Sequence, residues 1–511
     1  MTDSEQPQTD KTNYQPPEGA VTDGIFGNDL PYEARAEWTV LRKKEKPIAE
    51  IFHVAYLARN ANFQERPLTF AFNGGPGAAA AFLHLGALGP HLAKFNDDGS
   101  APPPPAKLVE NPYSWLPFTD LVFVDPVGTG FSRTIDDPEK SGSSGKSSDS
   151  SSASNRKSSG EEEENREFYA IKRDLESLAE MMQRFLSEND RWRSPIFIAG
   201  ESYGGFRVAK LAKLLQESYG IGLNGAILVS PALEFQSLDP SDYDILSWVD
   251  TFPSMVATAA FHGKSQTYTT ETPRETVVAE AVKFASNDLV RLLLQGEAMP
   301  ASERESILQS MANQLGLPLD LVTKAQGRIT QPVFVRNLLR DRRQVCGLYD
   351  ATITAPDPFP DREQFEGPDP TLFGIDRVFS GAINVLLREV IGVKTDRTYH
   401  LLSLDINRTW KLDYDRHVLQ SQIGATDDLR YGLALNPHLK VYISHGYYDL
   451  VTPFQASNRI VQQMKLDETM ANNLQVRQFG GGHMFYIWSE SRTALWTEMK
   501  QFYDRAIASS Q

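Results

Sequence analysis

Five short, continuous apolar runs constrain the fold of this 511-residue chain more than any other feature. Their residues are apolar at successive rather than alternating positions, which suits strands buried on both faces of a parallel sheet. Helical patterns lie between the runs, and strand–helix–strand alternation predicts a doubly wound α/β sheet. The runs are residues 68–72 (LTFAF), 121–124 (LVFV), 196–199 (IFIA), 226–229 (AILV) and 441–444 (VYIS).

Two further patterns add elements to this sheet. Residues 36–59 alternate apolar and polar side chains on both sides of a charged, Pro-containing break, which predicts an antiparallel pair of strands. Residues 168–186 carry apolar side chains at helical spacing, which predicts an amphipathic helix. Its apolar stripe is Phe168, Ile171, Leu175, Leu178, Met182 and Phe185.

Composition excludes several classes of partner and location. The apolar fraction of 41% can build a sizeable core, and the net charge of −15 argues against a nucleic-acid partner. Because the chain has no run of about 18 apolar residues, we expect no membrane span. The single cysteine, Cys346, allows no intramolecular disulfide. The low cysteine count and the lack of an apolar leader at the N-terminus together favour a cytoplasmic location or a bacterial setting. A signal peptide that had been removed would instead imply a periplasmic or secreted protein.

The domain organisation follows from changes in composition. Residues 1–22 are polar and predicted to be disordered, and residues 23–235 form the first part of an α/β core. Within it, residues 136–165 are Ser-rich and then acidic, which predicts a flexible loop. Residues 236–425 lack the strand–helix rhythm and are predicted to form a helical cap over the C-terminal edge of the sheet. Residues 426–511 return to the core.

The sequence GESYG at residues 200–204 matches the G-x-S-x-G motif, after a strand and before a helix. This is the context of the nucleophile elbow of α/β-hydrolases. The turn is too sharp for side chains two residues to either side of the serine, which accounts for Gly200 and Gly204. The motif predicts Ser202 as a nucleophile.

A serine nucleophile needs a histidine base and an acid that orients it, and in α/β-hydrolases the acid comes first. His483 follows three glycines that let its loop approach another backbone. Asp449 follows the last central strand, where loops carry function. Asp413 and Asp415 follow no such strand and are weaker candidates for the acid.

Hydrolysis also needs donors for the oxyanion that develops on the attacked carbonyl. One expected donor is the backbone N–H of Tyr203, the residue after the serine. The second comes from a loop after an earlier strand, where Gly-Gly-Pro-Gly follows the run 68–72. The N–H of Gly75 is the candidate.

At this point five ordered blocks resemble the serine carboxypeptidases of the α/β-hydrolase fold. The resemblance indicates a mostly parallel sheet flanked by helices, with a helical cap insertion where residues 236–425 lie. The single cysteine and missing leader suggest a bacterial-type member. The blocks are NGGPG (73–77), ENPYSW (110–115) with DPVGTGFS (125–132), GESYGG (200–205), HGYYD (445–449) and GGGHM (480–484).

The resemblance implies a serine-type carboxypeptidase that removes one residue from a peptide with a free C-terminus through an acyl-enzyme. Ser202 would attack the carbonyl, His483 would act as base and then acid, and Asp449 would hold the imidazole. Gly75 and Tyr203 would supply the oxyanion donors.

The family binds the substrate carboxylate with positions that correspond to Asn73, Gly74 and Glu201. A second glutamate normally shares a proton with the latter, in the pattern E-x-G-P. This chain has GALGP, which puts Ala87 at that position, and a lone carboxylate repels a substrate carboxylate unless it is protonated or paired. Arg207 is a candidate partner for Glu201. The family's disulfides are absent, and the Ser-rich loop has no counterpart.

Alternative functions remain open at this point. An esterase, an acyltransferase or another peptidase would keep the triad and change the carboxylate recognition. A binding protein on a hydrolase scaffold is disfavoured because all three triad positions are filled. We expect no metal and no cofactor, since H-E-x-x-H is missing and NGGPG lacks the G-K-[ST] ending of a phosphate loop. The sequence carries no signal of the oligomeric state.

Overall fold

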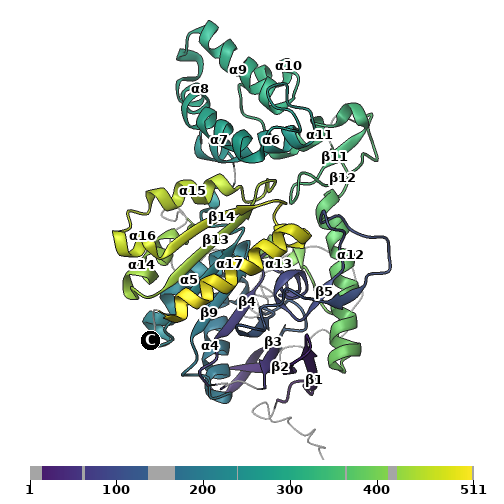
Figure 1. Cartoon of the computed structure of the whole chain (residues 1–511), viewed down its shortest axis with the longest axis vertical. Coiled ribbons are helices and arrows are strands. Elements are labelled where there is room, and N and C mark those ends of the chain that lie inside the picture. The colour runs from purple at the N-terminus through teal and green to yellow at the C-terminus, as the bar shows by residue number, and fades with distance from the viewer. Residues whose placement is uncertain are drawn as a thin grey trace, which may run out of the picture.

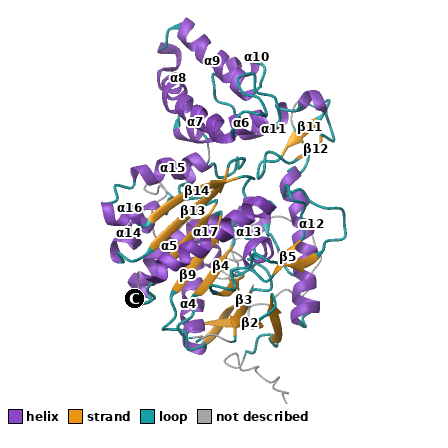
Figure 2. Ribbon diagram, viewed as in Figure 1, coloured by secondary structure: helices purple, strands orange, loops and turns teal. Residues whose placement is uncertain are grey.

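The computed structural model describes residues 14–59, 62, 64–135, 167–238, 240–362, 365–411 and 423–508. Its centre is a ten-stranded mixed sheet in the order β1-β2-β3-β7-β4-β9-β10-β13-β14, with β8 pairing with β3 (Figures 1 and 2). The strands are β1 (Ala20–Phe26), β2 (Leu30–Lys43), β3 (Lys46–Ala58), β4 (Leu68–Phe72), β7 (Asp120–Val124), β8 (Arg133–Thr134), β9 (Ile196–Glu201), β10 (Gly225–Val229), β13 (Lys440–Gly446) and β14 (Leu474–Phe479). Two small sheets pair β5 (His91–Ala93) with β6 (Leu108–Glu110) and β11 (Gln344–Cys346) with β12 (Thr354–Pro356).

The five apolar runs are confirmed as strands β7, β4, β9, β10 and β13, which pair in parallel with one another. The sequence analysis did not identify β14, the last parallel strand, because only Phe479 in it is buried. The predicted antiparallel pair is also confirmed as β2 and β3. Together these elements form the mixed, mostly parallel sheet of the predicted α/β-hydrolase fold.

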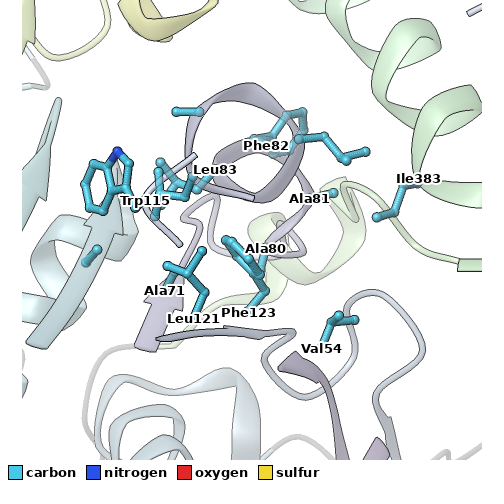
Figure 3. Close-up of a cluster of buried hydrophobic side chains, with 14 of the residues drawn as sticks. Val54, Ala71, Ala80, Ala81, Phe82, Leu83, Trp115, Leu121, Phe123 and Ile383 are labelled. Carbon is cyan, nitrogen blue, oxygen red and sulfur yellow. The ribbon is translucent and has the colours of Figure 1, made fainter. Parts of the chain in front are cut away.

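Helices cover both faces of the sheet, which explains why the strand sequences are apolar at successive positions. In β4, Phe70 and Phe72 contribute to the core on one face and Ala71 to the core on the other. Figure 3 shows part of the second core, where Phe82, Trp115 and Ile383 surround strand residues. The helices of the sheet layer are α1 (Ala81–Leu83), α4 (Ile171–Glu188), α5 (Tyr203–Ser218), α12 (Pro370–Val385), α13 (Leu404–Thr409), α14 (Thr426–Leu435), α15 (Phe454–Gln463), α16 (Glu468–Asn472) and α17 (Ser489–Ala508).

The predicted amphipathic helix is confirmed as α4, although Phe168 lies just before its first turn. All six residues of its apolar stripe are buried. They belong to one core cluster, which also contains residues of α5 and α14. The helical spacing therefore identified the face of α4 that packs against the sheet.

Residues 236–425 contribute to two different packing units. Six helices form a lobe with its own apolar core, which includes Phe252, Leu289 and Phe334, and Figure 1 shows this lobe above α15 and β14. In contrast, α12 packs its buried residues Phe379 and Ile383 into the core of the main sheet. The helices of the lobe are α6 (Leu246–Phe261), α7 (Arg274–Phe284), α8 (Val290–Gln295), α9 (Ala301–Leu315), α10 (Leu319–Lys324) and α11 (Gln331–Asn337).

Several segments that the sequence predicts to be loops lie partly or wholly outside the described residues. Strand β1 begins at Ala20, within the segment 1–22 that was predicted to be disordered, and residues 1–13 lie outside the described residues. The Ser-rich loop 136–165 and the weaker acid candidates Asp413 and Asp415 lie outside them as well. Among the helices that the structure describes, none combines the length and apolar character needed to cross a bilayer.

Asp120, at the start of β7, forms a buried ion-pair network that predicts a measurable effect on stability. Its carboxylate accepts hydrogen bonds from Arg66 Nε and from Arg191 Nη1, each at 2.7 Å, and Arg191 is 1% exposed. In Asp120→Ala, the Arg191 guanidinium would stay buried without its carboxylate, and we expect the free energy of unfolding to fall by about 3–5 kcal/mol. Urea unfolding followed by circular dichroism measures this.

The matched control for Asp120→Ala is Asp428→Ala. Asp428 pairs with Lys210 at 2.6 Å on the surface, where its side chain is 27% exposed. Because solvent screens such pairs, the loss should be below about 1 kcal/mol. Equal losses for the two variants would contradict the role given to the Asp120 network.

Candidate active site

The turn between β9 and α5 holds the predicted nucleophile in a strained conformation. Ser202 has φ 60° and ψ −122°, outside the regions that non-glycine residues favour, and its side chain is half-buried. A Cβ atom added to Gly200 would lie 2.1 Å from the carbonyl oxygen of Gly204. The predicted reason for these glycines is therefore confirmed, since the turn has no room for a side chain at this contact.

The predicted acid and base are in direct contact. Asp449 Oδ2 lies 2.7 Å from His483 Nδ1, and both side chains are buried. Asp449 Oδ1 accepts the backbone N–H groups of Val451 and Thr452, at 2.7 and 3.0 Å, which fixes the carboxylate. With Nδ1–H donated to a carboxylate, the imidazole presents Nε2 as its basic nitrogen.

Burial lowers the pKa of His483, but the charge and hydrogen bond of Asp449 and the charge of Glu201 raise it, and the net result is a pKa above the usual value. The carboxylate therefore makes the imidazole a stronger base than a free histidine.

Ser230, at the end of β10, connects the loops that carry these residues. Its hydroxyl donates to the carbonyl of His483 at 2.8 Å, and its backbone N–H donates to Ser444 in β13 at 2.7 Å. Ser202 N–H in turn donates to Val229 at 2.9 Å, at the end of the same strand. The three predicted triad residues thus follow the C-terminal ends of β9, β13 and β14, where α/β sheets carry their sites.

The NGGPG loop after β4 packs directly against the turn that contains the nucleophile. A Cβ atom on Gly74 would lie 2.6 Å from the backbone nitrogen of Tyr203 and 2.7 Å from the carbonyl oxygen of Glu201. Gly75 has a φ of +100°, which side chains rarely adopt. The two predicted oxyanion donors, Gly75 and Tyr203, therefore belong to two backbone segments in van der Waals contact.

Glu201 has a buried carboxyl group with two partners on one oxygen. Its Oε2 accepts hydrogen bonds from the side-chain amide of Asn73 and, at 2.8 Å, from the hydroxyl of Tyr486. Burial raises the pKa of Glu201 to about 7, against the charge of His483 and the hydrogen bonds of Tyr486 and Asn73. The sequence analysis did not identify Tyr486, and its place three residues after His483 was the only signal available.

Arg207 is not the partner of Glu201 that the sequence suggested. Its guanidinium forms a two-point ion pair with Asp174 of α4, at 2.7 and 3.0 Å, and is fully buried. Its remaining Nη1 donates to the carbonyl of Asn73 at 2.6 Å, and the guanidinium carbon Cζ lies over the ring of Tyr203, 4.9 Å from its centroid. Helix α5 directs the Arg207 side chain toward α4 and away from the Glu201 carboxyl group. Arg207 therefore stabilises the backbone of the NGGPG loop through its hydrogen bond to Asn73.

Residues far away in the sequence, between β11 and β12, hold the histidine loop. The carbonyl of Tyr349 accepts the backbone N–H of His483 at 2.5 Å, and the two rings meet edge to face. Asp350 Oδ2 accepts the N–H of Gly482 at 2.9 Å and the indole N–H of Trp488 at 3.0 Å. Neither residue stood out in the sequence, because both depend on a contact across more than 130 positions.

A groove of about 520 Å³ opens beside the NGGPG loop. It is lined by α12 and by residues 399–405, and Ser403 in that stretch donates its N–H to the carbonyl of Gly77 at 2.8 Å. Over the residues with described side chains, no group of His, Cys, Asp and Glu is arranged to hold a metal ion.

Comparison with known proteins shows similarity to one family over part of the chain. The sequence model of the family described as "Serine carboxypeptidase" matches residues 29–246. Serine carboxypeptidase-like 13 of Arabidopsis thaliana is 27% identical over 220 residues, which cover 42% of each chain. The pheromone-processing carboxypeptidase kex1 of Aspergillus niger is 29% identical over 176 residues, or 33% of this chain and 21% of that protein.

Each of these matches spans less than half of the relative's own length. Both relatives are eukaryotic, one from a plant and one from a fungus, so the expectation of a bacterial-type member is not supported. Among solved structures, the crystal structure of VinJ covers 92% of this chain and 98% of its own, with 11% identity and a TM-score of 0.37. The family model matches less than half of this chain, from residue 29 to residue 246, and within that segment the chain is similar to the serine carboxypeptidase family.

Proposed function

We propose that the protein is a serine carboxypeptidase that hydrolyses the last peptide bond of a peptide with a free C-terminus. The observation that carries the proposal is the 2.7 Å contact between His483 and Asp449, in a loop joined through Ser230 to the strained turn at Ser202. A serine in such a turn, with a histidine–aspartate pair at neighbouring strand ends, is the arrangement of a hydrolytic triad.

In the proposed reaction, Ser202 Oγ attacks the carbonyl carbon while His483 Nε2 takes its proton. The N–H groups of Gly75 and Tyr203 stabilise the tetrahedral oxyanion. His483 then protonates the leaving amino acid, the C–N bond breaks, and an acyl-enzyme remains. Water, deprotonated by the same imidazole, attacks the ester and releases the shortened peptide. Asp449 holds the imidazole and stabilises its protonated form.

Recognition of the substrate carboxylate is assigned to Asn73, Gly74 and Glu201. An ionised Glu201 would repel this carboxylate, whereas a protonated one can donate a hydrogen bond to it. The pKa of about 7 supports the protonated form at acidic pH. Recognition of a free C-terminus is therefore compatible with a single glutamate.

Ala87 favours a second candidate function. It replaces the glutamate that family members use to share a proton with the residue at position 201, and it is buried. An enzyme that has lost carboxylate recognition would keep the triad and act as an esterase, an acyltransferase or another peptidase. The two functions differ in their preference for a free C-terminus.

Two peptides with the same acyl part, one ending in a free carboxylate and one in an amide, separate these functions. For a carboxypeptidase we expect kcat/KM for the free acid to exceed that for the amide by at least about tenfold near pH 6, because a charged contact contributes more than about 1.4 kcal/mol. Product release measured by chromatography tests this. Ser202→Ala is the control and should abolish both rates and labelling by a fluorophosphonate. Equal rates on the two peptides would favour the esterase or acyltransferase function.

Asp350 provides a second test, because it contacts the histidine loop and not the substrate. Asp350→Ala removes the acceptor of Gly482 N–H, and we expect the loop to lose its fixed position and fluorophosphonate labelling of Ser202 to slow by roughly 10-fold or more. The control is Asp341→Ala, which removes a surface carboxylate of the same region that pairs with Lys264. Unchanged labelling in a folded Asp350→Ala protein would show that the loop keeps its position without this contact.

A further inference from the structure

One oxygen of the Glu201 carboxyl group is left without a partner. Glu201 is 2% exposed, and among the described residues no group donates to or accepts from Oε1. Oε2, in contrast, has two hydrogen-bond partners, Asn73 and Tyr486. A buried polar atom without a partner is costly and requires an explanation, and a group of the substrate is one that a substrate site supplies.

Tyr486 reaches Glu201 through space that a missing side chain leaves open. Its ring is fully buried, and a Cβ atom on Gly86 would lie 2.4 Å from its Cε2. The 3₁₀ turn Phe485–Ile487 packs against the turn His84–Leu88, which contains both Gly86 and Ala87. The phenol therefore contacts Glu201 from beside the position where the resemblance expects the second glutamate.

The hydrogen bonds around Oε2 determine which oxygen can carry a proton. Asn73 Oδ1 accepts the backbone N–H of Leu83 at 3.0 Å, so its Nδ2, a donor only, must face Glu201 Oε2. This N–H and the Tyr486 hydroxyl, at 2.8 Å, both donate to Oε2, and together they occupy its two lone pairs. The neutral acid therefore carries its proton on Oε1.

We propose that Tyr486 is a positioning residue that takes the place of the missing second glutamate and directs the proton of Glu201 onto Oε1, which donates it in a hydrogen bond to the free carboxylate of the substrate. This inference rests on the proposed carboxypeptidase function. It assigns recognition of the C-terminus to a carboxyl–phenol pair in place of a pair of carboxyl groups.

The pair formed by Glu201 and Tyr486 predicts a specific pH dependence of the rate. The groups that act on Glu201 are His483 and Asp449 of the triad, and Tyr486 and Asn73, which donate hydrogen bonds to it. Burial raises the pKa of Glu201 to about 7, so the group is a neutral donor below this pH and a repelling carboxylate above it. The rate on a free acid should therefore fall as pH rises through about 7. The rate on an amide depends on neutral His483 and should only rise.

The test measures kcat/KM from pH 5 to 9 on the free-acid and amide peptides. In the wild type we expect a fall on the alkaline side for the free acid alone. Tyr486→Phe removes a hydrogen bond that lowers the pKa of Glu201, so this fall should move to higher pH by about one unit. Glu201→Gln cannot ionise and can still donate from its amide, so the fall should disappear.

Tyr442→Phe is the matched control, because Tyr442 is also buried and donates to a glutamate, Glu498, at 2.6 Å. It should leave the pH profile on the free acid where it is in the wild type. Should Tyr486→Phe fail to fold, as judged by circular dichroism, Tyr486→His keeps a ring at this position, and the same shift of the fall to higher pH is expected when its ring donates no hydrogen bond to Glu201. Glu201→Gln tests separately whether Glu201 is the titrating group.

The outcomes separate the inference from the function on which it rests. A free-acid preference with an alkaline fall that neither variant moves would overturn the inference and leave the carboxypeptidase function standing. An alkaline fall of equal size on the amide would also overturn it, since the titrating group would then not act on the substrate carboxylate. A wild type that labels at Ser202 but shows no free-acid preference at any pH would overturn both.

Discussion

The close approach of two backbone segments is the constraint on which the site depends. The NGGPG loop after β4 and the turn after β9 touch so closely that a Cβ atom on Gly74 would lie 2.6 Å from Tyr203 N, and one on Gly204 would lie 2.6 Å from the carbonyl oxygen of Phe72. Parallel pairing of β4 with β9 brings the two segments to the same edge of the sheet. Glycine then allows contact distances that any other residue would prevent.

Buried charge stabilises this contact from the opposite side. Arg207 and Asp174 form a two-point ion pair between α5 and α4, and the third interaction of the guanidinium is with the carbonyl of Asn73. A buried guanidinium needs all of its partners satisfied to offset the cost of leaving water. The ion pair thereby links the packing of α4 and α5 to the position of the NGGPG loop. In this loop, the side chain of Asn73 contacts Glu201.

Carboxyl groups near the site differ in their surroundings and hence in their chemistry. Asp449 Oδ1 accepts two backbone N–H groups, and its Oδ2 contacts His483 Nδ1. Glu201 is equally buried but has two donors on one oxygen and no partner on the other within the described residues, and burial raises its pKa to about 7. One carboxyl group can therefore hold an imidazole while its neighbour, when neutral, can face an anion.

The local patterns of the sequence determined the strands, the turn and the pairing of the acid with the base. Continuous apolar runs identified five of the six parallel strands, because burial on both faces favours apolar residues at successive positions. Glycines next to Ser202 and His483 identified the turns that need them. Strand β14 was not predicted, because most of its side chains are only half-buried or exposed and its sequence therefore lacks a continuous apolar run.

Only the tertiary structure decided the partners of these residues. Tyr486 contacts Glu201 across 285 positions, Asp350 contacts Gly482 across 132, and Arg207 selects Asp174 rather than Glu201. Such contacts depend on how helices and loops pack on the sheet, and a single sequence has no periodicity or spacing that encodes them. The candidates for nucleophile, base and acid are thus readable from local sequence, whereas the ionisation of Glu201 depends on burial and on distant neighbours that only the packed fold brings together.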